Sequence, residues 1–238
     1  MRRVGTGVPV RSRNDPRQYD DLADQWWNPA GPFAALHWLA QARAEHLPAP
    51  MPGSVLLDVG CGGGLMASHT SGYVHVGVDA TESALRVAAR HGVIPVRADA
   101  GALPFPDRIA DVVIAGELFE HVTDLEAAVR EVARVLRPGG VLLFDTINDT
   151  PWARVSLVMV GERLPGGPPR RIHDPALFVS PRRLARLLDA HGIRIWVRGL
   201  RPAVLDYLRF LVSRRRPVRM IPTRSLAALY QGRGTKGP

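Results

Sequence analysis

Two carboxylates and an imidazole lie within one short segment, Glu117-Leu118-Phe119-Glu120-His121. Carboxylate oxygens suit Mg²⁺, and an imidazole also accepts Zn²⁺ or Mn²⁺. A divalent cation held by Glu117, Glu120 and His121 could polarise a bound hydroxyl group and lower its pKa. Two alternatives stay open. His121 could act as a metal-free general base, or the acids could merely stabilise the start of a helix through its dipole.

A glycine-rich turn forms a second candidate site, in Asp58-Val59-Gly60-Cys61-Gly62-Gly63-Gly64. Gly60 and Gly62 allow a tight turn and a close approach of a ligand to the backbone, because they carry no Cβ. The free N–H groups at the start of the next helix would face that ligand. A dinucleotide fingerprint needs a further glycine where this chain has Leu65, so the pattern does not indicate a dinucleotide site.

Acidic residues end the predicted strands that follow this turn. Asp79 ends the second strand and Asp99 the third, while Asp111 begins the fourth. A carboxylate at the position of Asp79 can accept hydrogen bonds from both hydroxyls of an adenosine ribose. Any one of these acids alone would more often be a solvated residue at a strand end. Their order along the chain favours a nucleoside-binding edge.

Apolar strands alternate with helices through most of the chain, which predicts an α/β fold with a doubly wound, mostly parallel sheet. Ligands bind at the carboxyl edge of such a sheet, so both candidate sites should lie there. The pattern predicts seven strands, over residues 54–59, 74–78, 93–97, 111–115, 141–146, 194–198 and 226–230.

The chain divides into a lead-in and a single domain. Residues 1–18 are polar and are expected to be a disordered lead-in. Within the single domain, 19–238, we expect a helical lid over 19–47, because Asn28-Pro29 breaks the helical pattern there. The ligand-binding core should cover 54–147. Residues 148–180 interrupt the alternation of strands and helices, which predicts an insertion after the fifth strand that covers the acceptor side.

The formal net charge is +9, and arginine supplies nearly all of it because Lys236 is the only lysine. A protein with such a charge can bind nucleic acid or an anionic membrane surface, or the charge can merely keep the protein soluble. The single cysteine, Cys61, excludes an intrachain disulfide and favours a reducing cytoplasm. We find neither a secretory signal nor an apolar run long enough to span a membrane, so a cytoplasmic location is expected.

Two apolar stretches in the C-terminal half could contact a lipid surface. Residues 152–160 lie inside the predicted insertion, and residues 205–212 form an amphipathic pattern next to Arg214-Arg215-Arg216. An amphipathic segment bordered by arginine can lie in an anionic lipid interface. This arrangement predicts peripheral contact with the inner face of the membrane. Alternatively, both stretches pack on the sheet.

The glycine turn with Asp58 in front of it resembles the first motif of class I methyltransferases. Three further segments resemble the UbiG family, the O-methyltransferases of ubiquinone biosynthesis. Residues 26–37 are similar to that family's Trp-Trp-Asp-x-x-Gly-x-Phe-x-x-Leu-His stretch. Residues 117–122 match its Glu-x-x-Glu-His-Val, and residues 173–181 match its His-Asp-x-x-x-Phe-x-x-Pro. The resemblance runs from about residue 26 to about residue 199.

The resemblance implies a Rossmann-like class I methyltransferase fold that binds S-adenosylmethionine, with Mg²⁺ at Glu117, Glu120 and His121. Two positions depart from the family. Arg43 follows Ala-Gln-Ala where the family has Asn-Pro-x, and Gly116 replaces a methionine. The residues implied to touch the cofactor are Arg43, Gly60, Gly62, Asp79, Asp99 and Gly116.

The expected reaction is methyl transfer from S-adenosylmethionine to a phenolic or catechol oxygen of a small molecule, which could carry a polyprenyl chain as quinone precursors do. Either His121 would remove the proton of that hydroxyl as a general base, or the cation would lower the pKa of the hydroxyl. One alternative is an RNA methyltransferase, although no RNA-binding module is recognisable and nucleic acid is not the expected partner. Another is a catalytically silent protein of this fold at a membrane surface. The identity of the acceptor and the oligomeric state stay open.

Overall fold

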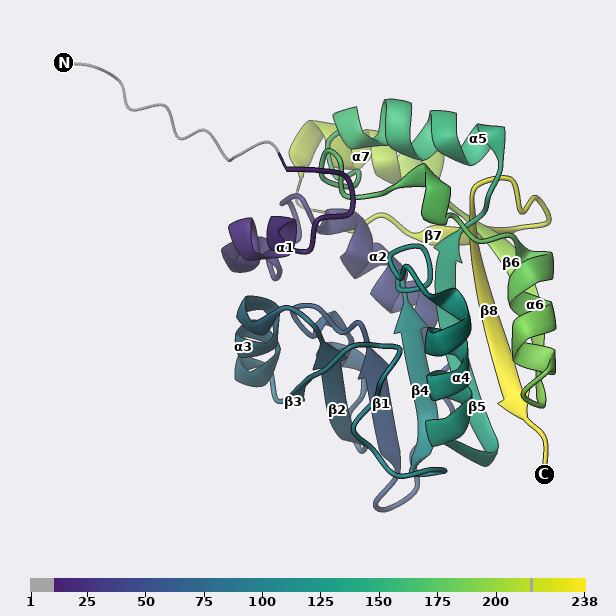
Figure 1. The fold of residues 1–238 in the computed structure, drawn as a ribbon. Helices are drawn as coiled ribbons and strands as arrows, with labels where there is room; N and C mark the ends of the chain where they lie inside the picture. Colours follow the sequence, from purple (N-terminus) through teal and green to yellow (C-terminus); the bar gives the residue numbers. More distant parts are fainter. Residues whose placement is uncertain (1–10, 215) are drawn as a thin grey trace.

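A single sheet of eight strands forms the centre of the computed structural model, which describes residues 11–214 and 216–238. The strand order is β3-β2-β1-β4-β5-β8-β6-β7 (Figure 1). Neighbouring strands from β3 to β5 are parallel, and β8 lies antiparallel between β5 and β6. The strands are β1 (Val55–Val59), β2 (Val74–Asp79), β3 (Ile94–Arg97), β4 (Ala110–Gly116), β5 (Leu136–Ile147), β6 (Ile193–Pro202), β7 (Met220–Thr223) and β8 (Leu229–Lys236).

The sheet has eight strands and not the predicted seven. The additional strand is β7, which pairs antiparallel with the end of β6. It is only four residues long and contains Pro222, so its sequence lacks a clear strand pattern. An edge strand tolerates proline because one side of its backbone needs no partner. The last strand also begins at Leu229, three residues after the predicted start at Leu226.

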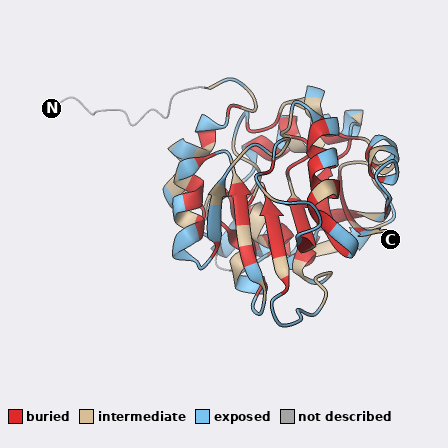
Figure 2. Ribbon diagram, turned by 60° about the horizontal axis from the view of Figure 1, so that its bottom comes forward, coloured by how far each residue is buried: buried red, intermediate tan, exposed pale blue. Residues whose placement is uncertain are grey.

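Helices cover both faces of the sheet, which is why its central strands are continuous apolar runs. Leu57 and Val113 face the helices α4 (Leu125–Val135) and α6 (Pro181–Asp189). The residues before them in the chain, Leu56 and Val112, face α2 (Ala34–Ala44) and α3 (Glu82–Arg90). Figure 2 shows the buried strands between these two layers. The sheet therefore provides a rigid edge at the carboxyl ends of β1, β2 and β4.

The segment before the sheet folds over this edge. It contains α1 (Arg17–Asp21), η1 (Ala23–Gln25) and then α2. The structure corrects the expected disordered lead-in for residues 11–18, while residues 1–10 lie outside the described part. Asp15 and Gln18 are buried, and Gln18 Nε2 donates to the carbonyl oxygen of Arg171 at 3.0 Å. Contacts with distant residues therefore order this polar segment, and composition alone does not reveal them.

Residues 148–180 also lie at the carboxyl edge, as an irregular helical region. The long helix at the top of Figure 1 is α5 (Pro151–Ala153) continued by the π-helical turns η3 (Arg154–Val160), and α7 (Val204–Ser213) lies behind it. The predicted amphipathic stretch at 205–212 thus forms α7. No helix in the described part of the chain is long and apolar enough to cross a membrane. The remaining short helices are η2 (Leu65–His69), η4 (Gly161–Arg163) and η5 (Pro175–Leu177).

Candidate functional site

A cavity of about 630 Å³ opens at the carboxyl ends of β1, β2 and β4. Segments that are far apart in the sequence form its wall: the glycine turn, the N-terminal helices, the loop after β4 and the end of the predicted insertion. Its lining includes every predicted site residue except Glu120, which is fully buried beside it. Those lining residues are Arg43, Gly60, Gly62, Asp79, Asp99, Gly116, Glu117 and His121.

The glycine turn connects β1 to η2 at the base of the cavity. Gly60 and Gly62 have φ angles of 76° and 51°, which are strained for residues with a side chain. A Cβ on Gly62 would overlap the ring of Trp26, and one on Gly60 would come within 2.8 Å of Leu118. These positions therefore need glycine for both backbone conformation and space.

Asp79 is anchored by this same turn. Its carboxylate accepts hydrogen bonds from the N–H of Gly62 at 2.9 Å and of Thr81 at 2.8 Å. Burial raises the pKa of Asp79, and these two donors oppose that shift. The carboxylate keeps further lone pairs for a ligand. Asp99 lines the cavity from the turn after β3, where it accepts from the N–H of Gly101 at 2.7 Å.

Arg43 reaches the cavity from the last turn of α2. Its Nε and Nη2 donate to the two oxygens of Asp145 in β5, each at 2.7 Å, and both residues are buried. Burial lowers the pKa of Arg43, but the charge of Asp145 outweighs this effect and the net shift is upward. The guanidinium lies against Gly116, where a Cβ would overlap it. The departure at Gly116 thus makes room for Arg43.

Three aromatic rings cover the glycine turn. The rings of Tyr19 and Phe33 both stack near Trp26, with centroids 5.7 and 4.2 Å from that of Trp26 and 6.1 Å from each other. Trp27 donates from Nε1 to the carbonyl oxygen of Gly63 at 2.8 Å. The tandem tryptophans therefore hold the predicted lid segment, 19–47, against the turn.

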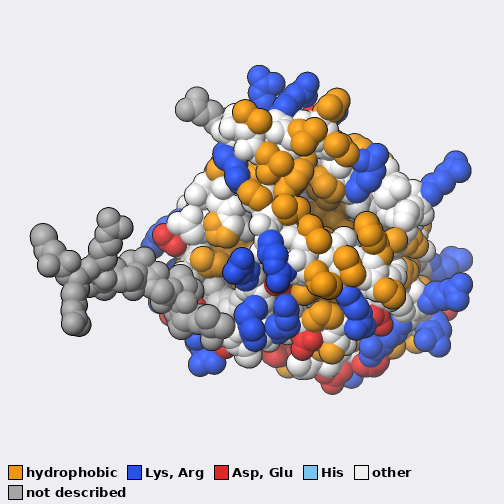
Figure 3. All heavy atoms as spheres, turned by 90° about the horizontal axis from the view of Figure 1, so that it is seen from above, with side chains coloured by type: hydrophobic (Ala, Val, Ile, Leu, Met, Phe, Trp, Pro, Cys, Tyr) orange, Lys and Arg blue, Asp and Glu red, His pale blue; other side chains and the backbone are white. Residues whose placement is uncertain are grey.

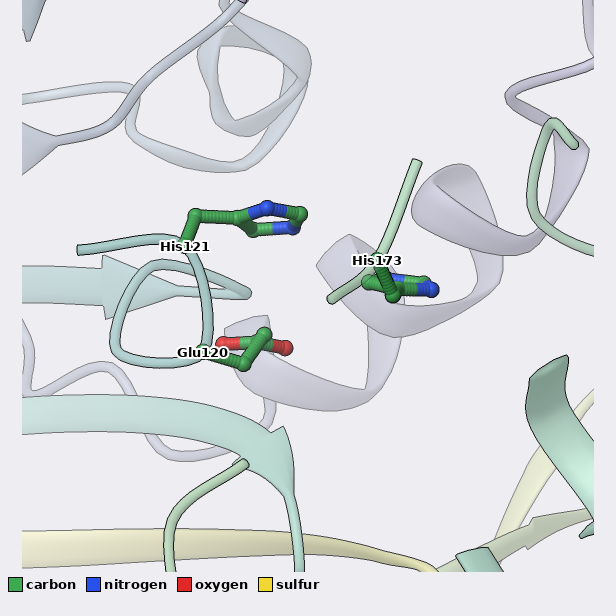
Figure 4. A group of neighbouring side chains, drawn as sticks. All are labelled: Glu120, His121 and His173. Carbon is green, nitrogen blue, oxygen red and sulfur yellow. The ribbon is translucent and has the colours of Figure 1, made fainter. Parts of the chain in front are cut away.

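A second cluster of polar side chains lies on the other side of the cavity. The donor atoms of Glu120, His121 and His173 lie within 4.8 Å of one another, and Figure 4 shows the three side chains converging. The structure thus groups His173, and not Glu117, with Glu120 and His121. Glu117 lines the cavity but falls outside this group. The sequence pattern does not mark His173 as a site residue, although His173 begins the His-Asp segment of the family resemblance.

Burial keeps this cluster, and the nearby Glu117, nearly free of charge. It raises the pKa of Glu117 well above the usual range, and the nearby Glu120 adds to that shift. It raises the pKa of Glu120 to about 8 and lowers the pKa of His121 to about 4. It also lowers the pKa of His173 well below its usual value. At neutral pH the imidazoles therefore have free lone pairs and the carboxyl groups largely hold their protons.

Several polar atoms of this cluster and of Glu117 are buried without a hydrogen-bond partner in the described part of the chain. They include Oε1 of Glu117, Oε1 of Glu120 and Nδ1 of His173. The other oxygen of Glu120 accepts from the hydroxyl of Thr146 at 2.8 Å. Buried polar atoms normally have partners, and unpaired ones mark places where a ligand or an ion can bind. The cavity can therefore receive a nucleoside on one side and a polar reacting group on the other.

Comparisons with known proteins agree with this arrangement. Residues 57–144 match the family model described as a methyltransferase domain. The chain is 32% identical to the ubiquinone biosynthesis O-methyltransferase of Coxiella burnetii, over 75% of this chain and 80% of that protein. It is 34% identical to the protein of the same name from Thiobacillus denitrificans, over 74% and 81%.

The fold itself matches that of a solved S-adenosylmethionine-dependent methyltransferase from Thermotoga maritima. The TM-score is 0.66 at 20% identity, and the match covers 92% of this chain and 97% of that one. With the glycine turn and the ordered strand-end acids, these matches confirm the resemblance described above. The chain is an S-adenosylmethionine-dependent methyltransferase of class I and belongs to the family of the ubiquinone biosynthesis O-methyltransferases.

Proposed function

We propose that this methyltransferase methylates a hydroxyl oxygen of a phenol or catechol that carries a polyprenyl or similar apolar chain. The names of its relatives support an oxygen acceptor. The observation that carries the proposal is the cluster of Glu120, His121 and His173 beside the cavity, where apolar residues such as Leu118 and Ile172 form part of the wall. A phenolic ring fits this mixture of apolar walls and buried polar atoms.

S-adenosylmethionine would lie across the glycine turn, against Gly60 and Gly62. Asp79 would accept from the ribose hydroxyls, and Asp99 would contact the adenine edge. Arg43 uses two of its nitrogens for Asp145 and keeps Nη1 for the charged end of the cofactor. Gly116 lines the same cavity, and Arg43 occupies the space that a side chain there would take. This placement directs the methyl group toward His121 and Glu117.

The reaction is an in-line displacement at the methyl carbon: the oxygen–carbon bond forms as the carbon–sulfur bond breaks. The protein must orient the two reactants and remove the proton of the hydroxyl. The pKa of a phenol is about 10, whereas burial lowers the pKa of His121 to about 4, so the imidazole acting alone is a weak base for this proton. This gap favours assistance by a cation over a metal-free base.

A divalent cation fits the cluster, because Glu120 and His173 each offer a buried atom without a partner. Glu120, His121 and His173 would hold it, and it would supply Lewis acidity that lowers the pKa of the acceptor hydroxyl. One carboxylate and two imidazoles suit Zn²⁺, Mn²⁺ or Fe²⁺ better than Mg²⁺, which prefers oxygen ligands. We therefore propose a transition metal in place of the expected Mg²⁺.

Turnover of labelled S-adenosylmethionine against a panel of acceptors tests this proposal. The panel contains simple catechols, polyprenyl phenols and, as a control, RNA, each with and without added divalent cation. We expect methylation of phenolic acceptors and none of RNA. Methylation of RNA but of no phenol would overturn the proposed acceptor class.

We further propose that an apolar face on α5, η3 and α7, at the top of Figure 1, contacts an anionic membrane. This face consists of Trp152, Val155, Met159 and Val160 near α5 and of Val204, Leu205, Leu208, Leu211 and Val212 in α7, all exposed. Figure 3 shows such apolar side chains gathered around a hollow, with basic side chains between and around them. Arg209 and Arg216 border a groove on α7. Arg215 lies outside the described residues. The charge at this border matches an anionic lipid surface.

A further inference from the structure

Asn14 makes two hydrogen bonds to His121, a residue 107 positions away in the chain. Its Nδ2 donates to the backbone carbonyl oxygen of His121 at 2.9 Å. Its Oδ1 lies 2.6 Å from Nδ1 of the His121 ring. A single amide side chain therefore holds both the backbone and the ring of His121.

The direction of the first hydrogen bond determines which atom donates the proton in the second. A carbonyl oxygen only accepts, so the amide nitrogen of Asn14 must face it and Oδ1 must face the ring. Because Oδ1 is also only an acceptor, Nδ1 of His121 must carry the proton. In a neutral imidazole the remaining lone pair then belongs to Nε2. This is the nitrogen left for the space that His121 shares with Glu120 and His173 (Figure 4).

The backbone around Asn14 is held in place from the other side of the cavity. Its N–H donates to the carbonyl oxygen of Arg171 at 3.1 Å. Arg13 Nη1 donates to the carbonyl oxygen of His173 and to Glu162, both at 2.8 Å. The segment thus connects the two loops that carry the histidines. Asn14 has a φ of 56°, a conformation that asparagine tolerates better than most residues with a side chain.

We propose that Asn14 is a positioning residue that holds His121 in its Nδ1–H tautomer and presents Nε2 to the acceptor hydroxyl or to a cation. Histidines that bind metals commonly donate their other N–H to such a partner, which fixes the tautomer and the ring orientation. The use of Nε2 rests on the proposed function of His121. The tautomer and its dependence on Asn14 do not, because they can be measured in the absence of turnover.

Three variants separate this role from a general one in folding. Asn14→Gly removes the amide but keeps a backbone that accepts a positive φ. Asn14→Asp keeps an acceptor for Nδ1–H and tolerates the same backbone conformation. Arg17→Ala is the matched control, because Arg17 is exposed in the same segment and its ion pair among residues 11–214 and 216–238 is with its near neighbour Asp15.

The main measurement is the nitrogen NMR spectrum of the His121 ring, which distinguishes the two tautomers. The signals of His121 are assigned by their loss in His121→Gln. We expect the Nδ1–H form in the wild type, in Asn14→Asp and in Arg17→Ala, and a shift toward the Nε2–H form in Asn14→Gly. An Nε2–H form in the wild type, or an unchanged tautomer in Asn14→Gly, would overturn the proposal even if another variant fails to fold.

Turnover supplies the second measurement. Asn14→Gly should lower kcat by about 10- to 100-fold, the usual effect of removing a partner of this kind, while KM for the cofactor changes little. Asn14→Asp should recover much of the loss. A rise in the KM for the cofactor with unchanged kcat would show a structural role only. Absence of turnover in the wild type would contradict the proposed function, but the tautomer spectra would still decide the role of Asn14.

Discussion

The guanidinium of Arg43 lies directly against Gly116, so closely that the α-carbon of Gly116 has no room for a Cβ. Arg43 cannot simply turn away, because two of its nitrogens bind Asp145 and both residues are buried. The absence of a side chain at Gly116 and the placement of Arg43 are thus one feature of the site.

Gly116→Ala should displace Arg43 and weaken its ion pair with Asp145. Breaking a buried pair outright costs about 3–5 kcal/mol, which sets the upper limit for the loss of unfolding free energy. Affinity for S-adenosylmethionine should fall as well. Urea unfolding and calorimetry measure the two effects, with Gly237→Ala as the control because its Cβ would meet nothing closer than 3.5 Å. Unchanged stability and affinity would show that Arg43 is free to move.

Asp79→Ala should weaken binding of S-adenosylmethionine at least about tenfold, because charge-assisted hydrogen bonds contribute about 1.5–3 kcal/mol each. Burial raises the pKa of Asp79, so wild-type affinity should fall as the pH decreases through a value above the usual 3.8. A protonated carboxyl group cannot accept from both hydroxyls with equal strength. Calorimetry between about pH 7 and pH 4 measures this, in a range that lies above the ordinary pKa of an aspartate.

The variant should lack this loss of affinity at low pH, whereas Asp107→Ala, at an exposed acid outside the cavity, should behave as the wild type. An unchanged affinity in folded Asp79→Ala would place the cofactor elsewhere.

Removal of divalent cations should abolish turnover while leaving cofactor binding intact. Readdition should restore it, with Mn²⁺ or Zn²⁺ effective at lower concentration than Mg²⁺ because two ligands are imidazoles. His173→Ala should weaken cation binding at least about tenfold, since it removes a direct ligand and even indirect partners have effects of this size. His191→Ala, at an exposed histidine, is the control. Full activity after exhaustive chelation would leave His121 as a metal-free base.

The protein should sediment with anionic vesicles at low salt and much less with neutral ones. Replacing Arg214 and Arg216 by alanine should weaken this binding by about 2 kcal/mol, or roughly thirtyfold, at about 1 kcal/mol for each cation near the surface. Leu205→Asp should also weaken this binding. Ile94→Asp should not, because Ile94 is exposed on β3 and lies far along the sequence from the residues of this face. Equal recovery in the supernatant with both kinds of vesicle would contradict the membrane proposal.

The sequence allowed prediction of the side of the cavity that the glycine turn forms, but not all of the side that carries the histidines. Gly60, Gly62 and Asp79 lie at the ends of neighbouring parallel strands, so their spacing along the chain determines their neighbourhood in space. Their place in the cavity could therefore be predicted from local pattern alone.

His173 and Asn14 reach the cavity from irregular segments whose path depends on contacts between distant residues. No periodicity describes such a path, and the polar composition around Asn14 pointed to disorder instead. For His173 a signal did exist, since it begins a segment shared with the family. The short edge strand β7 escaped prediction for a related reason: four residues that include Pro222 carry no strand pattern of their own.

The position of β8 has a consequence for the order in which the molecule assembles. The parallel half of the sheet, β1 to β5, is complete in sequence before β6 is made, but the ladder that joins β6 to β5 passes through β8. During synthesis on the ribosome, β6 and β7 therefore cannot join the rest of the sheet until β8, the strand that separates them from it, has been made. Such long-range pairing is slow compared with local contacts. We expect strands β1 to β5 to pair first. In a late step, β8 then pairs with both β5 and β6 and joins the two halves of the sheet.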